Sequence, residues 1–298
     1  MITNVLSVDV EEYYHAAIFQ RGTSALGAQR FESRVEQSVD RLLALLSEHN
    51  ARGTFFVVGE VAAHHPAMVR RIAAEGHEIG CHSNRHESVN VQSPAQFRAD
   101  TRAAKARIED ALGEEVDGYR APNFSIGRAQ AWAYQILLDE GFRYDSSLYP
   151  IVHDRYGDPA APRFPYEIHR EGPRSLTEFP IGTARLVGVN LPIGGGGFFR
   201  LLPGPLTRLG IAHVNLVERR PVMFYLHPWE LDPEQPRPPM AWYHRFRHYV
   251  GMEKETAKLS ALLDRFQFAT ASEVLQSYAP PAPRHVPERV LTAESRAL

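Results

Sequence analysis

The stretch NVLSVDVEEYYH, residues 4–15, joins a short apolar run to three closely spaced carboxylates. Residues 4–8 have the length and the branched side chains of a buried β-strand. Asp9, Glu11 and Glu12 follow this run directly. Carboxylates crowded at the end of a buried strand repel one another unless something binds there. We therefore expect a functional group at this strand end.

Similar apolar runs alternate with helical patterns along the rest of the chain. Apolar residues recur at helical spacing in residues 35–46 and 97–112. Strands separated by helices are typical of a mainly parallel sheet. We therefore predict an α/β fold built as a distorted or incomplete (β/α) barrel. The further strands that we predict are 53–58, 77–81, 117–120, 142–145, 176–179, 222–227 and 266–270.

The chain of 298 residues, 44% of them apolar, is long enough for one large domain. We predict a single domain over residues 1–279, with a Pro/Gly-rich insertion at about 146–215 and an aromatic and Pro-rich segment at 228–250. We expect a disordered tail at 280–298. The insertion contains PIGGGGFF, which no Lys-Ser/Thr pair follows, so we predict a flexible or tightly turned loop there rather than a phosphate site.

Composition excludes several classes of protein. The chain has 33 basic and 35 acidic residues and no basic block, which argues against nucleic-acid binding. Its single cysteine, Cys81, excludes an intrachain disulfide and a cysteine-based zinc site. No run approaches 18 uninterrupted apolar residues, and the first residues do not read as a signal peptide. We therefore expect a soluble, cytoplasmic chain without a transmembrane segment, and its oligomeric state is unknown.

Polar residues stand at the ends of five predicted strands. In a parallel barrel the carboxyl ends of all strands meet at one rim, where such folds carry their active sites. Packing alone does not explain five polar residues in these positions, so we predict an active site at this rim. The five residues are Asp9, His82, Arg120, Asp145 and His227.

The segment CHSNRH, residues 81–86, contains two histidines four residues apart. One helical turn would direct both His82 and His86 to one cation, whereas the alternative is a pair of hydrogen-bonded loop histidines. His244 and His248 have the same spacing, but the arginines between them disfavour a cation. Two imidazoles and one carboxylate leave zinc with open coordination positions, and a second carboxylate nearby can accept a proton from water.

Arg120 and His227 each have a structural and a functional interpretation. Arg120 of YRAPNF could form a surface ion pair, or it could hold a general base ionised through a bidentate contact. His227 of VMFYLHPWE could be structural, or it could protonate a leaving group. In the functional interpretation, Asp145 of YDSSLYP raises the pKa of His227 and fixes its tautomer.

Five short segments together resemble the motifs of the NodB-type polysaccharide deacetylases, carbohydrate esterase family 4. The segments are, in order, VDVEEYY, HSNRH, RAPNF, YDSS and YLHPW, and the resemblance covers about residues 4–275. GGGGFFRLLP and FYLHPWELDPEQP further resemble the exosortase-associated subgroup of exopolysaccharide gene clusters. The resemblance implies a distorted (β/α) barrel and a metal-dependent hydrolase that removes acetyl groups.

The resemblance also implies a role for each matching residue. These roles are a general base and its arginine partner, two metal ligands, and a general acid with the carboxylate that tunes it: Asp9 and Arg120, His82 and His86, His227 and Asp145. The family usually binds one divalent ion, most often zinc.

The first motif departs from the commonest family pattern of two adjacent aspartates, because Val10 follows Asp9. Strand alternation puts Asp9 and Glu11 on the same side, so we predict Glu11 as the third metal ligand and Glu12 as the reserve.

Four residues are predicted to bind substrate. Pro122 and Asn123 belong to the RAPNF motif, and Trp229 and Trp242 offer aromatic faces on which sugars stack. The alternative for the tryptophans is that they cover the core.

The predicted substrate is an acetylated exopolysaccharide or its lipid-linked oligosaccharide precursor. The predicted reaction is removal of acetyl groups, with N-deacetylation of an amino sugar as the first choice. Two alternatives remain open. One is an allantoinase-like amidohydrolase acting on a small cyclic amide, and the other is a catalytically degenerate carbohydrate-binding protein.

Overall fold

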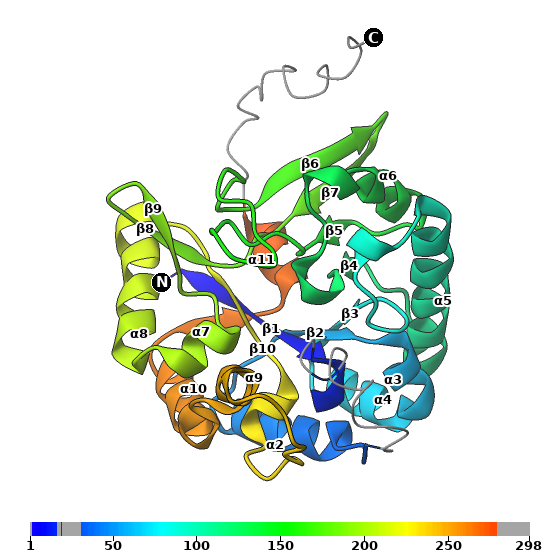
Figure 1. Ribbon diagram of the computed structural model, residues 1–298. Helices are drawn as coiled ribbons and strands as arrows, with labels where there is room; N and C mark the ends of the chain where they lie inside the picture. The colour runs from blue at the N-terminus through cyan, green and yellow to red at the C-terminus, as the bar shows by residue number, and fades with distance from the viewer. Residues whose placement is uncertain (1, 17–18, 20–30, 279–298) are drawn as a thin grey trace.

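The computed structural model describes residues 2–16, 19 and 31–278, which fold around one curved sheet (Figure 1). The strand order is β10-β1-β2-β3-β4-β5-β7-β6, and β11 pairs with β1. Its strands are β1 (Thr3–Val10), β2 (Thr54–Val57), β3 (Glu78–Cys81), β4 (Gly118–Tyr119), β5 (Tyr144–Asp145), β6 (Tyr166–Glu171), β7 (Arg174–Glu178), β10 (Met223–Leu226) and β11 (Gln267–Ala269). A separate antiparallel hairpin consists of β8 (Thr183–Leu186) and β9 (Val189–Pro192).

The sheet is parallel from β10 to β7, and only β6 runs antiparallel to its neighbour. Just beyond β7, Ile181 forms an isolated parallel bridge to Met223 of β10, the strand at the opposite edge. The chain therefore curves most of the way around without a closed ladder. The predicted distorted or incomplete barrel is confirmed.

Side chains of β1 alternate between two apolar clusters. Leu6, Val8 and Val10 pack in the large cluster that the surrounding helices complete. Val5 belongs to a second cluster with Phe56 of β2, inside the curve of the sheet. Because alternate residues share a face, Asp9 points to the same inner side as Val5. The sheet thus places the Asp9 carboxylate in the interior of the barrel.

Most helices surround the sheet on its outer side (Figure 1). The longer helices are α2 (Val35–Glu48), α3 (Gly59–His64), α4 (Pro66–Ala74), α5 (Pro94–Leu112), α6 (Trp132–Asp139), α7 (Gly196–Leu201), α8 (Gly204–His213), α9 (Trp242–Tyr249), α10 (Glu255–Leu263) and α11 (Ala271–Ser277). Helix α11 instead lies near the middle of the molecule and packs Ala271 and Val274 in the inner cluster. One π-helical turn, η5 (Val214–Glu218), extends α8. Short 3₁₀ turns are η1 (Tyr13–His15), η2 (Val89–Val91), η3 (Pro122–Phe124), η4 (Arg128–Gln130), η6 (Pro228–Leu231) and η7 (Met252–Lys254).

All eight predicted strands are present, but the stretch at 146–215 is more ordered than its Pro/Gly content suggested. Its strands β6 and β7 extend the main sheet, and β8 and β9 form the hairpin. The loop predicted at PIGGGGFF is wrong in part, because helix α7 begins at Gly196. The turn before it requires glycine: Gly195 has φ +108°, and a Cβ there would lie 1.9 Å from the carbonyl oxygen of Tyr225.

Some expectations fall outside what the structure describes. The tail predicted at 280–298 lies beyond the described residues, and the single-domain boundary at 279 stays a prediction. Cys81 is buried and free. Among the described helices, none has the length and apolar character needed to cross a bilayer. The expected cytoplasmic location stays a prediction.

Candidate metal and catalytic site

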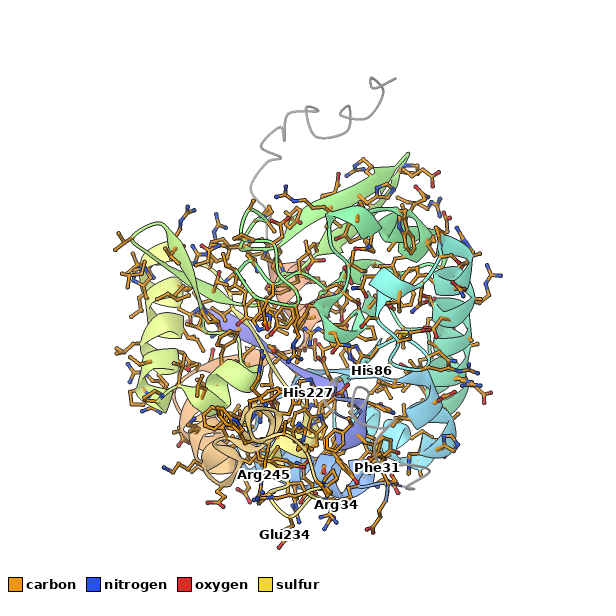
Figure 2. The ribbon with its side chains drawn as sticks, viewed as in Figure 1. Phe31, Arg34, His86, His227, Glu234 and Arg245 are labelled. Atoms are coloured by element: carbon orange, nitrogen blue, oxygen red, sulfur yellow. The ribbon has the colours of Figure 1, made fainter. Side chains whose placement is uncertain are left out.

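A pocket lies at the carboxyl ends of the parallel strands, on the inner side of the barrel. Figure 2 shows His86 and His227 together near the middle of the molecule, and both line this pocket. Four of the five strand-end residues predicted from the sequence meet here or directly behind its wall. The lining includes Asp9, Glu11, His82, His86, Asn123, Phe124, Arg155, Tyr156, Arg200, Tyr225, His227, Trp229, Arg247 and His248.

Three buried side chains form a group suited to a metal ion. One ligand atom each from Glu11, His82 and His86 lies within 4.8 Å of the others. Nδ1 of His82 is 2.8 Å from the carbonyl oxygen of Arg120, so an N–H at Nδ1 donates there and leaves the Nε2 lone pair for a cation. Trp229 Nε1 donates to Glu11 Oε1 at 3.1 Å and orients that carboxylate.

The local backbone, rather than regular structure, brings these ligands together. Strand β1 ends at Val10, and the Glu11 N–H donates to the carbonyl oxygen of Asp9 at 3.1 Å. A tight turn therefore places Glu11, and the predicted strand alternation does not extend that far. The helical turn predicted for His82 and His86 is also wrong, because Ser83 and His86 adopt φ of +60° and +57°. The Ser83 hydroxyl accepts from the His86 N–H at 3.0 Å, and this loop holds the two rings 5.1 Å apart.

Charges in the group match what a divalent cation requires. Burial alone would raise the pKa of Glu11, but the neighbouring His86 and His227 hold it well below its usual range. Burial lowers the pKa of His82 to about 4 despite the nearby Asp9. A carboxylate and a neutral imidazole are the forms that bind metal. The residues present therefore fit a divalent ion.

Asp9 and Arg120 form a buried ion pair beside this group. Arg120 Nη1 donates to Asp9 Oδ1 at 2.7 Å, and the arginine is fully buried. Its remaining N–H groups donate to the carbonyl and hydroxyl oxygens of Ser146 at 3.0 and 2.8 Å, and its guanidinium lies 4.3 Å from the Phe56 ring. A contact between Asp9 and Arg120 is thus present, but through one N–H rather than the predicted bidentate pair, and Ser146 holds the rest of the guanidinium in one orientation.

His227 faces both carboxylates from β10, across the pocket. Its Nε2 lies 3.7 Å from Glu11 Oε1 and 3.9 Å from Asp9 Oδ2, and its side chain is 19% exposed. On the other side of the ring, Glu230 Oε1 lies 3.6 Å from Nδ1. Burial alone would lower the pKa of His227, but Glu11, Glu230 and Asp9 together raise it to about 9. The imidazole is therefore protonated at neutral pH and can donate a proton into the pocket.

The structure corrects the predicted contact between Asp145 and His227. Asp145 accepts from the Ser147 hydroxyl at 2.6 Å and lies opposite Glu178 in the sheet. Burial raises the pKa of both acids, so we expect the two to share a proton. Ser147 in turn accepts from the Ala121 N–H at 2.8 Å, so Asp145 supports the segment that carries Arg120. Among the described residues, no hydrogen bond or ion pair joins Asp145 to His227, whose nearby carboxylates are Asp9, Glu11 and Glu230.

Glu230 takes the place expected for Asp145, and sequence reasoning missed it. Its Oε2 accepts from the backbone N–H of His227 at 3.1 Å, because the two residues are the first and last positions of a capping box at η6. Arg200 Nε donates to the other oxygen at 2.8 Å. The three-residue spacing in HPWE was a usable signal for Glu230. No sequence signal pointed to Arg200, which lies 27 residues before His227.

Comparisons with known proteins agree with this geometry. Residues 24–138 match the polysaccharide deacetylase family, the stretch that supplies His82, His86 and Arg120. This stretch of the chain therefore resembles a polysaccharide deacetylase domain. Residues 146–276 match a domain of unknown function, DUF3473, which carries Arg200, His227 and Glu230. The exosortase-associated subgroup stays a prediction.

Curated relatives match only part of this chain. It is 33% identical over 96 residues to a chitooligosaccharide deacetylase of Bradyrhizobium sp. (strain ANU 289), covering 32% of this chain and 42% of that one. It is 28% identical over 82 residues to a peptidoglycan-N-acetylmuramic acid deacetylase of Bacillus subtilis (strain 168), covering 28% and 31%. The chain thus spans less than half the length of these relatives.

Solved structures share the fold over almost the whole chain. A putative polysaccharide deacetylase from Mycobacterium smegmatis superposes with a TM-score of 0.60 at 20% identity, covering 94% of this chain and 93% of that one. A probable polysaccharide deacetylase from Pseudomonas aeruginosa PAO1 and a Puue allantoinase each reach 0.57 at 18% identity, covering 92% and 89%. Since the allantoinase fits as well, the shared fold does not distinguish these activities.

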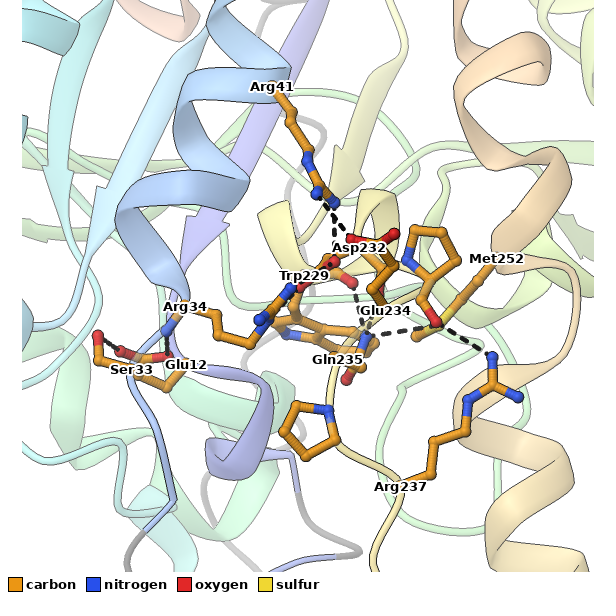
Figure 3. Close-up of polar contacts among 12 residues, drawn as sticks. Glu12, Ser33, Arg34, Arg41, Trp229, Asp232, Glu234, Gln235, Arg237 and Met252 are labelled. Atoms are coloured by element: carbon orange, nitrogen blue, oxygen red, sulfur yellow. Dashed lines mark hydrogen bonds and ion pairs between the residues drawn. The ribbon is translucent and has the colours of Figure 1, made fainter.

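Glu12, the reserve ligand, points away from the Glu11, His82 and His86 group. Its Oε2 accepts from the Arg34 N–H at 3.1 Å, and its Oε1 accepts from the Ser33 hydroxyl (Figure 3). These contacts tie Glu12 to the start of α2. The geometry favours Glu11 over Glu12 as a ligand.

The four predicted substrate-binding residues differ in position. Asn123 lines the pocket, with φ +56° and its side-chain amide donating to Ser88. Trp229 also lines it, but its ring is stacked between His227 and His248 and is almost fully buried. Pro122 is buried and is not among the lining residues, and Trp242 is 78% exposed on α9, away from the lining.

Proposed function

We propose that this chain is a metal-dependent hydrolase that removes acetyl groups from an exopolysaccharide or its precursor. The group that we propose first is the N-acetyl group of an amino sugar. The observation that carries the proposal is the convergence of three groups on one pocket. They are the Glu11, His82 and His86 cluster, the Asp9–Arg120 pair and the protonated His227. Base, metal site and acid are the parts that amide hydrolysis requires.

Asp9 serves as the general base in this proposal. Its Oδ1 is bound to Arg120 at 2.7 Å, so Oδ2 is the oxygen that faces the pocket and accepts a proton from water. Arg120 fixes the orientation of the carboxylate, because the guanidinium itself is anchored by Ser146. A divalent ion held by Glu11, His82 and His86, which we propose to be zinc, supplies Lewis acidity to the amide carbonyl and to the attacking water.

His227 serves as the general acid. Its Nε2 faces the same space as Asp9 Oδ2, at 3.9 Å, so the proposed base and acid face the same part of the pocket. Glu230, held by Arg200, stabilises the imidazolium and keeps Nε2 directed into the pocket. When the amide bond breaks, the departing amine takes the proton from Nε2.

The sugar substrate is inferred from the relatives and from the pocket wall. The matched relatives are named as chitooligosaccharide and peptidoglycan deacetylases, which supports an acetylated amino sugar. Asn123 contributes a polar edge and Tyr156 an aromatic one to the pocket, as expected of a carbohydrate site. An acetylated polysaccharide or a lipid-linked oligosaccharide would present the same N-acetyl group.

Metal content and acetate release measured on the same preparation test the proposal. We expect one divalent ion per chain, acetate release from N-acetyl chito-oligosaccharides, and loss of that activity in Asp9→Asn and His227→Ala. Full activity in metal-stripped protein would contradict it. Turnover of small ureides without acetate release would favour an allantoinase-like enzyme, and saccharide binding without turnover would favour a binding protein.

A further inference from the structure

Helix α8 with its extension η5 has apolar side chains on two opposite faces. One face packs against the protein through Thr207, Ile211 and Val214. The opposite face exposes four large apolar side chains at helical spacing, each more than half exposed: Leu206, Leu209, Leu216 and Val217. A helix that is apolar all round is normally covered on all sides. Within the described chain, nothing covers this second face.

The β8–β9 hairpin extends this exposed apolar surface. Strand β8 contacts α8, and the hairpin lies alongside the end of that helix at the outer edge of the molecule (Figure 1). Arg163 joins them by donating to both the hydroxyl and the carbonyl oxygen of Thr183 and to both oxygens of Glu218. Leu186 and Val189 pair across the hairpin and are both more than half exposed. We call the hairpin tip and the outer face of α8–η5 together the outer apolar surface.

The tip of the hairpin is an unusual place for valine. Val187 and Gly188 form the two-residue turn, with φ of +48° and +82°. Two positive φ angles are typical of a type I′ turn, for which asparagine and glycine are preferred and a β-branched residue is strained. Val187 is nevertheless 95% exposed. A strained, solvent-exposed valine costs free energy in the isolated protein, so its benefit lies in something that it contacts.

Positive charge accompanies this surface. Residues 183–220 contain five arginines, of which Arg200 is buried at the pocket and paired with Glu230, and one acid, Glu218, whose two oxygens are both bound to Arg163. Arg185, Arg208 and Arg219 form no ion pair within the described part of the chain, as is also true of the exposed Arg245 and Arg265, whereas Arg98, Arg102 and Arg128 are paired. Apolar side chains beside unpaired arginines are complementary to a bilayer with anionic headgroups.

We propose that the outer apolar surface binds an anionic phospholipid membrane, with the tip of the β8–β9 hairpin and the exposed face of α8–η5 inserted at the headgroup boundary. The inserted side chains are Leu186, Val187, Val189, Leu206, Leu209, Leu216 and Val217. The hairpin is also tied to the pocket wall, because Asn190 of β9 donates to the carbonyl oxygen of Pro150 in the loop that leads to Arg155 and Tyr156. Binding would hold the pocket beside the membrane, where a lipid-linked or emerging saccharide is found.

Vesicle co-sedimentation of the full chain tests this inference independently of catalysis. We expect binding to phosphatidylcholine vesicles that contain phosphatidylglycerol, little binding to phosphatidylcholine alone, and weaker binding as salt rises. The most informative variant is Val187→Asn, because asparagine suits the type I′ turn. It should keep or raise the melting temperature yet, together with Leu216→Ser, lower vesicle affinity at least about tenfold. Reversing Arg185 and Arg219 to glutamate should have an effect of similar size on anionic vesicles only.

Val91→Ser is the matched control, since Val91 is an exposed valine far from this surface in the sequence and should leave vesicle binding unchanged. All these variants should release acetate from soluble chito-oligosaccharides as the parent chain does. No binding to anionic vesicles, or equal loss in Val91→Ser, would overturn the inference. A vesicle-free dimer that becomes monomeric in Val187→Asn with Leu216→Ser would also overturn it, by assigning the surface to a second copy of the chain.

Discussion

Two buried arginine–carboxylate pairs flank the pocket, one from each half of the chain. Arg120 holds Asp9 in the half that matches the deacetylase family model and the strand before it, and Arg200 holds Glu230 in the half that matches the domain of unknown function. Asp9 faces the pocket, where we propose that the substrate binds. Glu230 stands behind His227 and acts on it from the far side of the ring.

The two pairs differ in how the fold brings them together. Asp9 and Arg120 end parallel strands of one sheet, so the strand order alone directs both to the same rim. Arg200 comes from a short helix after a glycine turn, and Glu230 from a 3₁₀ turn. The strands of the sheet therefore position Asp9, the proposed base. The carboxylate behind His227, the proposed acid, comes instead from irregular segments whose positions depend on long-range packing.

Replacing the carboxylate that reacts should have the largest effect. Asp9→Asn removes the proton acceptor, and we expect kcat to fall by about a thousandfold, measured as acetate release. The matched control is Asp232→Asn, which breaks a buried ion pair with Arg34 and Arg41 outside the pocket (Figure 3). It should lower stability and leave kcat nearly unchanged. Equal losses of kcat in both variants would mean that Asp9 acts only through stability.

Glu11 and Glu12 are adjacent in the sequence, but only Glu11 lies in the group with His82 and His86. Glu11→Gln should weaken metal binding at least about a hundredfold, because it removes a charged ligand, whereas Glu12→Gln should keep metal at one ion per chain. Metal content after dialysis, measured by elemental analysis, checks both. Retention of metal in Glu11→Gln together with loss in Glu12→Gln would reverse the assignment of the ligand.

Removing the Glu230 carboxylate should lower kcat less than Asp9→Asn does, and it should also shift the pH profile of kcat. Glu230 stabilises the charged imidazole, so Glu230→Gln should lower the pKa of His227 and deprotonate the acid at lower pH. We expect kcat to fall about tenfold and the alkaline limb of its pH profile to move to lower pH.

The control for Glu230→Gln is Glu255→Gln in the same buried cluster. Burial beside Glu230 raises the pKa of Glu255 to about 9, so this acid is already neutral at pH 7. Its replacement should leave the pH profile in place. A profile that does not move in Glu230→Gln would show that the carboxylate only supports the fold.

The smallest expected effect concerns the proton shared by Asp145 and Glu178. Burial raises the pKa of Asp145 from 3.8 to about 6 and raises the pKa of Glu178 as well. Because the folded pKa is raised, this pair stabilises the fold fully below the ordinary carboxyl pKa, and the contribution is lost as pH rises through about 6. Glu178→Gln should flatten this decline.

Melting temperatures between acidic and mildly alkaline pH measure the effect. The difference between Glu178→Gln and the parent chain should be roughly 2–4 °C for each kcal/mol recovered at high pH, and close to zero at the acidic end. Equal slopes in both proteins would show that the two acids do not share a proton.

Residue patterns predicted much of the fold and part of the site. All eight strands and the helices at 35–46 and 97–112 were readable, because apolar periodicity reports burial directly. Strand-end position brought Asp9, His82 and His227 to one pocket, with Arg120 directly behind Asp9. Strands β6, β8 and β9 were missed, because an exposed antiparallel ribbon has no continuous apolar run to reveal it.

The contacts made by irregular segments could not be predicted from the sequence. Asp145 satisfies the strand-end rule as well as His227 does, yet it pairs with Glu178. Which carboxylate approaches a given imidazole depends on the order of strands and on the direction of loops between them. A linear pattern records neither.

By itself, then, the sequence determined which residues would be buried in the barrel and which polar groups would end its parallel strands, since period and strand direction are local properties. Only the tertiary structure decided between Glu11 and Glu12, replaced Asp145 by Glu230 behind His227, and left the valine tip beside unpaired arginines. These outcomes depend on distances between segments far apart in the chain. The packing of the whole barrel sets such distances.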